Sequence, residues 1–142
     1  MSTEARILAL DVGSRTLGLA VSDPLGITAQ GLTTIRRKNR RADFAQLDDV
    51  VKKYGVKELV VGYPLRLSGA IGTQSEKMTA YAEQIRRRYE LPVHLWDERL
   101  TTAEAQRVLR ESEMSVKRRS EVVDQLAAVL ILQSFLQSRQ SK

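Results

Sequence analysis

The sequence contains no cysteine and a single histidine, His94. The absence of cysteine excludes disulfides, thiolate metal sites and a cysteine nucleophile, and one histidine cannot form a multi-histidine metal site. Any metal held by side chains must therefore have oxygen ligands. No apolar run reaches roughly the 20 residues needed to cross a membrane, and the segment Met1–Arg6 lacks the features of a secretion signal. We expect a cytoplasmic protein.

Aromatic residues are also scarce, with one Trp, four Tyr and two Phe in 142 residues. Because they form no repeated motif, a stacking platform for single-stranded nucleic acid is poorly supported. The chain is nevertheless long enough to bury a core of its own. We expect residues 1–142 to form a single domain.

Positive charge is in excess, with a formal net charge of +6. It is concentrated in three runs, at Arg36–Arg41, Arg86–Arg88 and Lys117–Arg119. A single run of this kind can simply form a solvated surface without a binding function. Three runs in one short chain favour a polyanionic partner, which we take to be nucleic acid.

Apolar periodicity predicts three opening strands, over residues 5–10, 17–22 and 27–35. The pattern then changes to a helical stripe over 43–54 that ends at Gly55. A short apolar run predicts a fourth strand over 59–62.

The second half of the chain alternates helices and strands. The capping boxes Thr73–Glu76 and Thr101–Glu104 begin helices on either side of a strand over 93–96, and the second of these helices reaches about Met114. A basic linker over 115–120, with Ser120 as N-cap, precedes the last helix.

The resulting order, βββαβαβαα, combines antiparallel opening strands with strand–helix–strand units. It predicts an α/β mixed sheet with helices on both faces, as in the ribonuclease H-like fold. Ligand sites in such sheets form at the carboxyl ends of strands. Asp11 and Glu98 both follow a predicted strand, and Asp124 could reach the same edge from the last helix.

These three carboxylates are the candidate catalytic and metal-binding residues. Clustered carboxylates away from water are costly unless a cation or a raised pKa neutralises them. The turn that begins at Asp11 also suits nucleotide binding or a plain structural turn. Asp124 could alternatively form a salt bridge with Arg15 or Arg99, which would remove it from the site.

Asp97 and Glu98 are adjacent, so in a continuing strand only one of them faces the site. We favour Glu98 as the ligand and Asp97 as a supporting group, although both could instead cap the following helix. His94 and Trp96 lie two residues apart and share one face of their strand. We expect both to serve packing rather than catalysis.

Four segments together resemble, in order and spacing, the YqgF/RuvX family of Holliday junction resolvases. They are ILALDVGSRTLGLAVSD at 7–23, VGYP at 61–64, WDERLTT at 96–102 and DQLAA at 124–128. The resemblance covers nearly the whole chain. It implies a RuvC-like carboxylate site, Mg²⁺ or Mn²⁺ as cofactor, and a bacterial nuclease that processes the 5′ end of precursor 16S rRNA or resolves recombination junctions.

The chain departs from the family pattern where substrate contacts are expected. Many members carry Arg at the position of Thr16, here preceded by Arg15, and carry Asn and Asp at the positions of Arg66 and Ser68. The expected nucleic-acid contacts are positively charged residues near the carboxylates: Arg15, Arg66, Arg99, Lys117, Arg118 and Arg119.

Two other functions remain open from the sequence. One is a nucleotide-binding domain of the actin and sugar-kinase type, against which the short chain argues because it leaves no room for a second lobe. The other is a non-catalytic RNA-binding or ribosome-associated module. The sequence does not distinguish RNA from branched DNA as substrate, nor a monomer from a homodimer.

Overall fold

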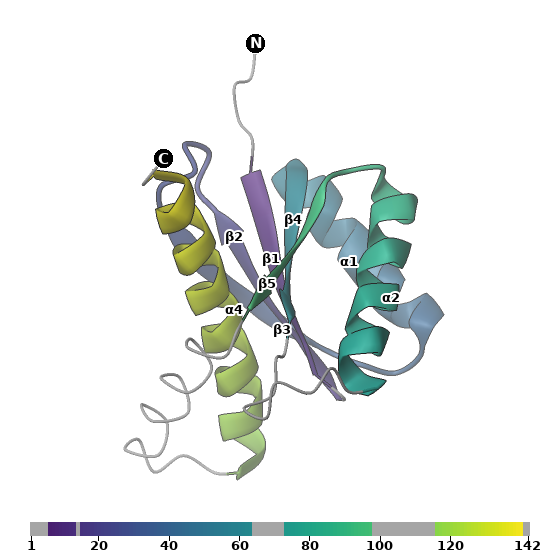
Figure 1. The fold of residues 1–142 in the computed structure, drawn as a ribbon. Helices are drawn as coiled ribbons and strands as arrows, with labels where there is room; N and C mark the ends of the chain where they lie inside the picture. Colours follow the sequence, from purple (N-terminus) through teal and green to yellow (C-terminus); the bar gives the residue numbers. More distant parts are fainter. Residues whose placement is uncertain (1–5, 14, 64–72, 98–115, 141–142) are drawn as a thin grey trace.

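A computed structural model describes residues 6–13, 15–63, 73–97 and 116–140 of the protein (Figure 1). For residues 63, 73–75, 97, 116–124 and 140 only the backbone is described. The predicted helix over 101–114 and the predicted loop over 65–72 lie outside the described residues. None of the described helices is long and apolar enough to cross a membrane.

Five strands form one mixed sheet in the order β3-β2-β1-β4-β5. Strands β1 (Arg6–Val12), β2 (Thr16–Ser22) and β3 (Ala29–Arg36) pair antiparallel, whereas β4 (Val56–Tyr63) and β5 (Val93–Asp97) add parallel to β1. This confirms the predicted combination of an antiparallel opening with parallel additions. The carboxyl ends of β1, β4 and β5 consequently share one edge of the sheet, where a ligand site is expected.

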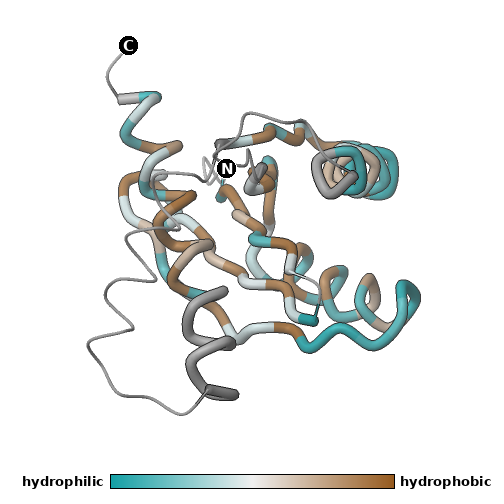
Figure 2. The backbone as a smooth tube through the Cα atoms, turned by 60° about the horizontal axis from the view of Figure 1, so that its bottom comes forward, coloured by the Kyte–Doolittle hydropathy of each residue, from teal (hydrophilic) through white to brown (hydrophobic). Residues whose placement is uncertain are grey.

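Helices cover both faces of the sheet, as predicted. α4 (Val116–Gln140) lies on one face, and α1 (Arg40–Tyr54) and α2 (Thr73–Tyr89) lie together on the other (Figure 1). Alternate residues of each strand face opposite sides of the sheet. Leu8 and Leu10 pack in the apolar cluster with α1 and α2, whereas Ile7 and Ala9 pack in the cluster with α4. Figure 2 shows the apolar residues concentrated between these layers.

α1 begins earlier than its apolar stripe predicted. Asn39 is its N-cap, and the Asn39 side chain accepts a hydrogen bond from the backbone N–H of Ala42 at 2.8 Å. The helix ends as predicted at Gly55, which adopts a left-handed conformation with φ of 60°. Arg40 and Arg41 therefore belong to the first turn of the helix and not to a preceding loop.

The predicted linker over 115–120 is wrong, because α4 already begins at Val116. Residues 116–121 contain neither proline nor glycine, and Lys and Arg are good helix formers, so nothing in this segment prevents helix formation. Ser120 is accordingly inside the helix and is not its N-cap. Asp124 lies about two turns into α4, where the helix dipole offers little compensation for a carboxylate.

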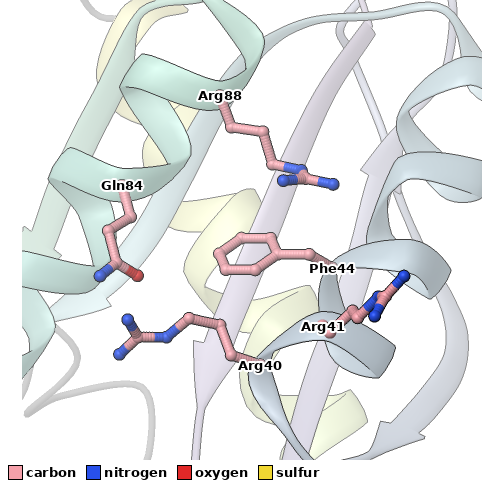
Figure 3. Close-up of a pocket in the computed structure, with 5 residues that line it drawn as sticks. All are labelled: Arg40, Arg41, Phe44, Gln84 and Arg88. Carbon is pink, nitrogen blue, oxygen red and sulfur yellow. The ribbon is translucent and has the colours of Figure 1, made fainter.

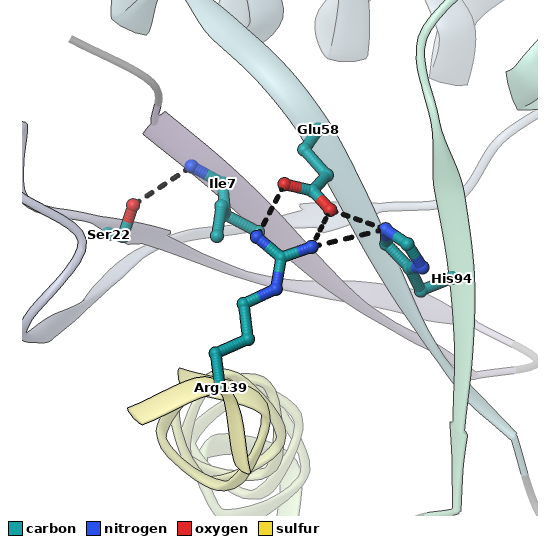
Figure 4. Close-up of polar contacts among 5 residues, drawn as sticks. All are labelled: Ile7, Ser22, Glu58, His94 and Arg139. Carbon is teal, nitrogen blue, oxygen red and sulfur yellow. Dashed lines mark hydrogen bonds and ion pairs between the residues drawn. The ribbon is translucent and has the colours of Figure 1, made fainter. Parts of the chain in front are cut away.

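An ionic cluster joins the carboxyl end of α4 to the beginnings of strands β4 and β5 (Figure 4). Arg139 donates two hydrogen bonds to the Glu58 carboxylate of β4, one of them at 2.8 Å, and His94 of β5 contacts the same carboxylate. The Arg139 guanidinium also lies 4.5 Å from the centre of the Phe135 ring. Burial raises the pKa of Glu58, but the hydrogen bonds from Arg139 and His94 outweigh it and leave the pKa lowered.

We expect Glu58→Gln to destabilise the protein by about 1 kcal/mol at neutral pH, a magnitude typical of partly exposed ion pairs. Because the folded-state pKa is lowered, the stabilisation is present above the unfolded-state pKa and is lost as the pH falls through the folded-state value. Urea unfolding of both proteins at neutral and acidic pH measures this. A difference that persists unchanged in acid would contradict the role of the charge, and Glu90→Gln, at an exposed position, is the control.

Candidate active site

Asp11 lies near the carboxyl end of β1, on the face of the sheet that α4 covers. It follows Ile7 and Ala9 at two-residue spacing, and both of these pack in the apolar cluster with α4. The Asp11 side chain is only partly buried. A carboxylate in this position is held by a rigid strand and remains accessible from the edge of the sheet.

Asp11 has glycines on both sides in the sheet. Gly18 of β2 is its register partner, and Gly62 of β4 follows Val61, the partner of Leu10. Both glycines fall on the α4 face, since each lies two residues from Ala20 or Val60 in the same apolar cluster. The positions beside Asp11 in the neighbouring strands therefore contribute no side chains of their own, and both glycines are buried.

The turn after Asp11 is fastened to the segment that joins β3 to α1. Arg37 donates from Nη1 to the carbonyl oxygen of Gly13 at 2.7 Å, and its backbone N–H donates to the carbonyl oxygen of Arg15 at 2.8 Å. The backbone N–H of Gly13 also donates to the carbonyl oxygen of Thr16 at 2.9 Å. Three hydrogen bonds thus fix the backbone that leaves the candidate site.

Arg37 is itself held by a buried carboxylate. Its Nε lies 3.7 Å from Oδ2 of Asp43, a residue that is 4% exposed, and Oδ1 of Asp43 accepts the backbone N–H of Lys38 at 2.9 Å. The sequence indicated Arg37 only as one member of a basic run. Its contact with Gly13 could not be read from the sequence because it depends on how β3 and α1 are joined in space.

Replacing Arg37 with lysine keeps the charge but removes the planar group that reaches Gly13 and Asp43 together. In the metal-dependent nuclease that the sequence predicts, this change should lower the activity by roughly 10- to 100-fold, the range typical of residues that support metal ligands. The concentration of Mn²⁺ needed for half-maximal activity should rise, an effect that a loss of stability alone does not produce. An unchanged metal requirement would contradict this role, and Arg87→Lys, on an exposed part of α2, is the control.

The part of α4 that carries Asp124 lies over the same end of the sheet. The neighbouring Gln125 donates from Nε2 to the carbonyl oxygen of Leu32 in β3 at 2.7 Å. A methyl group on Gly31 would lie only 3.0 Å from the Gln125 side chain, so the helix and strand are in close approach. Leu32 pairs with Leu19, which pairs with Leu10, and Gln125 is therefore level with the residue that precedes Asp11.

β5 ends at Asp97, which pairs with Tyr63 in parallel register. Two residues of β5, His94 and Trp96, face α4. Trp96 donates to Oγ of Ser134 at 3.2 Å, and the ring centre of His94 lies 5.2 Å from that of Phe135. These contacts confirm the prediction that His94 and Trp96 share one face, and both rings pack against Phe135. The end of β5 lies at the same edge of the sheet as the end of β1.

The structure thus places the backbone of Asp124, the side chain of Asp11 and the end of β5 at one edge. Glu98, Arg66 and Arg99 lie outside the described residues, and so do the side chains of Asp97, Asp124 and the basic residues Lys117, Arg118 and Arg119. Arg15 is exposed beside the turn that follows Asp11. The part of the chain whose side chains are described holds no group of three possible metal ligands.

The donor chemistry of the candidate set suits a hard divalent cation. Asp and Glu provide only oxygen, which Mg²⁺ and Mn²⁺ prefer over nitrogen and sulfur ligands. Asp11 is partly accessible at the end of a rigid strand, between two positions without side chains. The residues present therefore fit a metal of this class, with Asp11 as the candidate ligand whose side chain is described.

Comparison with known proteins places the chain in a defined family. A family model described as "RuvX: Holliday junction resolvase" matches residues 5–138. A protein of Koribacter versatilis named "Putative pre-16S rRNA nuclease" is 59% identical over 97% of this chain and 90% of its own length. A protein of Moorella thermoacetica with the same name is 55% identical, over 92% of this chain and 94% of its own length.

Solved structures with the same architecture are more distant in sequence. Thermus thermophilus RuvC in complex with a Holliday junction substrate has a TM-score of 0.58 at 15% identity, and covers 96% of both chains. The Fowlpox virus resolvase, also solved with Holliday junction DNA, has a TM-score of 0.59 at 10% identity over 94% of this chain and 98% of its own. The fold is the predicted ribonuclease H-like fold, and the chain belongs to the RuvX family of nucleases.

Proposed function

We propose that this protein is a divalent-metal-dependent nuclease that cleaves phosphodiester bonds near the 5′ end of precursor 16S rRNA. The observation that carries the proposal is the arrangement of Asp11 at the end of β1, beneath the turn of α4 that contains Asp124. The substrate class follows the names of the relatives at 59% and 55% identity. Resolution of Holliday junctions, the activity in the family description, is the alternative.

We infer that Asp11, Glu98 and Asp124 are the catalytic residues and that their carboxylates would hold Mg²⁺ or Mn²⁺. Such an ion, when bound, supplies an activated water and neutralises negative charge on the scissile phosphate. Residues two apart in a strand share a face. Trp96 faces α4, so a continuation of the strand by one residue would place Glu98, and not Asp97, on that side as the third carboxylate.

The other residues of the chain would orient the substrate. Arg15, next to the turn that follows Asp11, can contact a phosphate close to the cleaved bond, and Arg37 keeps that turn in place. Arg66, Arg99, Lys117, Arg118 and Arg119 are the further proposed contacts. Contacts of this kind position a nucleic-acid backbone without reading its sequence.

The proposed setting is the bacterial cytoplasm, with precursor rRNA or branched DNA as partner. Residues 1–142 would form one nuclease domain that carries all three carboxylates. A monomer suffices for trimming rRNA. Symmetric cutting of a four-way junction instead requires two active sites, and hence a homodimer.

A side-by-side cleavage assay tests the proposal. The substrates are a precursor 16S rRNA 5′ segment, a four-way DNA junction and linear duplexes of matched sequence, each with Mg²⁺, with Mn²⁺ and with EDTA. We expect metal-dependent cleavage of the RNA in preference to the matched duplex. Preferred cleavage of the junction would assign resolution as the function, and binding without cleavage of any substrate would favour a non-catalytic RNA-binding module.

A further inference from the structure

Two basic runs that are far apart in the sequence meet at one groove on the surface of the helical layer. The groove lies between α1 and α2 and has a volume of about 520 Å³. It is lined by Arg40, Arg41 and Phe44 of α1 and by Gln84 and Arg88 of α2 (Figure 3). Among the residues that the structure describes, this lining contains three arginines and no carboxylate, although the two helices come from separate parts of the chain.

Arg88 is held in place before any ligand binds. Its guanidinium donates from Nε and Nη2 to the Asp48 carboxylate, at 2.8 and 2.6 Å, and lies 4.9 Å from the centre of the Phe44 ring. The hydrogen bonds from Arg88 lower the pKa of Asp48, despite the opposing effect of burial. The bidentate pair uses one edge of the guanidinium, so N–H donors on its other edge remain for an anion.

Arg40 and Arg41 stand at positions that helix stability does not favour. They occupy the first turn of α1, where the helix dipole disfavours positive side chains. Both are exposed, and no carboxylate among the described residues forms an ion pair with either one. Their presence in the first turn is therefore better explained by a ligand than by the stability of the helix.

The groove is connected to the candidate active site by a short segment. Arg36 is the register partner of Thr16, Arg37 contacts the turn that follows Asp11, and α1 then begins at Arg40. Positive residues thus continue from Arg15 beside the turn, through the end of β3, to the groove. A nucleic-acid strand whose scissile phosphate lies at Asp11 could follow this path.

We propose that the groove between α1 and α2 binds backbone phosphates of the nucleic-acid substrate at a distance from the cleaved bond. The inference rests on the proposed nuclease function and adds a second contact region on the face of the sheet opposite α4. Arg40 and Arg41 bind the phosphates, and Arg88 contributes donors at a fixed position. Phe44 is 6% exposed and stacks on Tyr81, so it supports the arginines and leaves the bases unread.

The test is a binding measurement on the double variant Arg40→Gln/Arg41→Gln, with a labelled precursor rRNA segment in EDTA so that no cleavage occurs. The matched control is Lys52→Gln/Lys53→Gln, which removes the same charge from the exposed other end of α1. Fluorescence anisotropy over a range of salt concentrations gives the affinity and its salt slope. Thermal melts verify folding, and the groove variant should melt at the wild-type temperature or above it, because the removed charges oppose the helix dipole.

We expect the groove variant to bind about tenfold more weakly than wild type and to lose about two from the magnitude of the salt slope, whereas the control keeps the wild-type slope. Equal behaviour of the two variants, with wild-type RNA binding intact, would overturn the groove but leave the nuclease proposal standing. An absence of salt-dependent binding by the wild-type protein would overturn both. A variant that loses affinity for an acidic peptide but not for RNA would assign the groove to a protein partner instead.

Discussion

Asp11→Asn is expected to remove nuclease activity while leaving the protein folded. The amide keeps the shape of the side chain but is neutral, so it binds a divalent cation much more weakly than the carboxylate. Changes to residues that only orient metal ligands typically cost 10- to 100-fold. The loss for a ligand itself should exceed roughly 100-fold, measured as initial rates on the precursor rRNA segment with saturating Mn²⁺.

The control for this change is Asp49→Asn, which makes the same substitution at an exposed position of α1. It should cleave at the wild-type rate. RNA binding in EDTA should also survive Asp11→Asn, because the arginines that we propose to contact phosphates are intact. A folded Asp11→Asn protein that cleaves at the wild-type rate would remove Asp11 from the mechanism.

The Asp124→Asn variant is expected to show whether Asp124 is a metal ligand or one half of a buried ion pair. If Asp124 shares a carboxylate cluster with Asp11 and Glu98, these groups repel one another without metal. Neutralising one of them should leave the melting temperature in EDTA unchanged or raise it. The same change should eliminate cleavage and reduce the stabilisation that Mn²⁺ gives through binding to the folded state.

A buried ion pair predicts the opposite behaviour in EDTA. Loss of Asp124 would then leave a cation unpaired and would destabilise the protein by roughly 3 to 5 kcal/mol. Thermal melts of wild type and variant, with EDTA and with Mn²⁺, distinguish the two cases. Marked destabilisation in EDTA together with a full Mn²⁺ shift would refute the metal role of Asp124.

The order of the elements along the chain, the mixed sheet and the helices on its two faces could be predicted from the sequence, because each element has its own local pattern of apolar residues. The apolar run of β1 and the two-residue alternation of β2 predicted strands, and the helical stripe of α1 ended at Gly55 as expected. The start of α4 could not be predicted in this way. Its first residues are polar and basic, and a polar segment without proline or glycine is compatible with either a linker or a helix.

The sequence could predict only those residues of the candidate site that lie at the ends of strands. Asp11 was identified because a carboxylate directly after an apolar run falls at the edge of a sheet. The role of Arg37 and the meeting of Arg40 with Arg88 were not predictable, since both depend on the packing of segments distant in the chain. Charge runs show that cations are present, but only the fold determines which of them share a surface.

The most direct measurement is the anomalous diffraction of Mn²⁺ in crystals of the protein grown or soaked with the ion. Our proposal predicts a peak within about 2.0 to 2.3 Å of carboxylate oxygens from Asp11 and Asp124, with Glu98 completing the set. The same peak should be absent from crystals of the Asp11→Asn variant. Mn²⁺ bound to other residues, or no Mn²⁺ at this edge of the sheet in a preparation that cleaves its substrate, would contradict the proposed site.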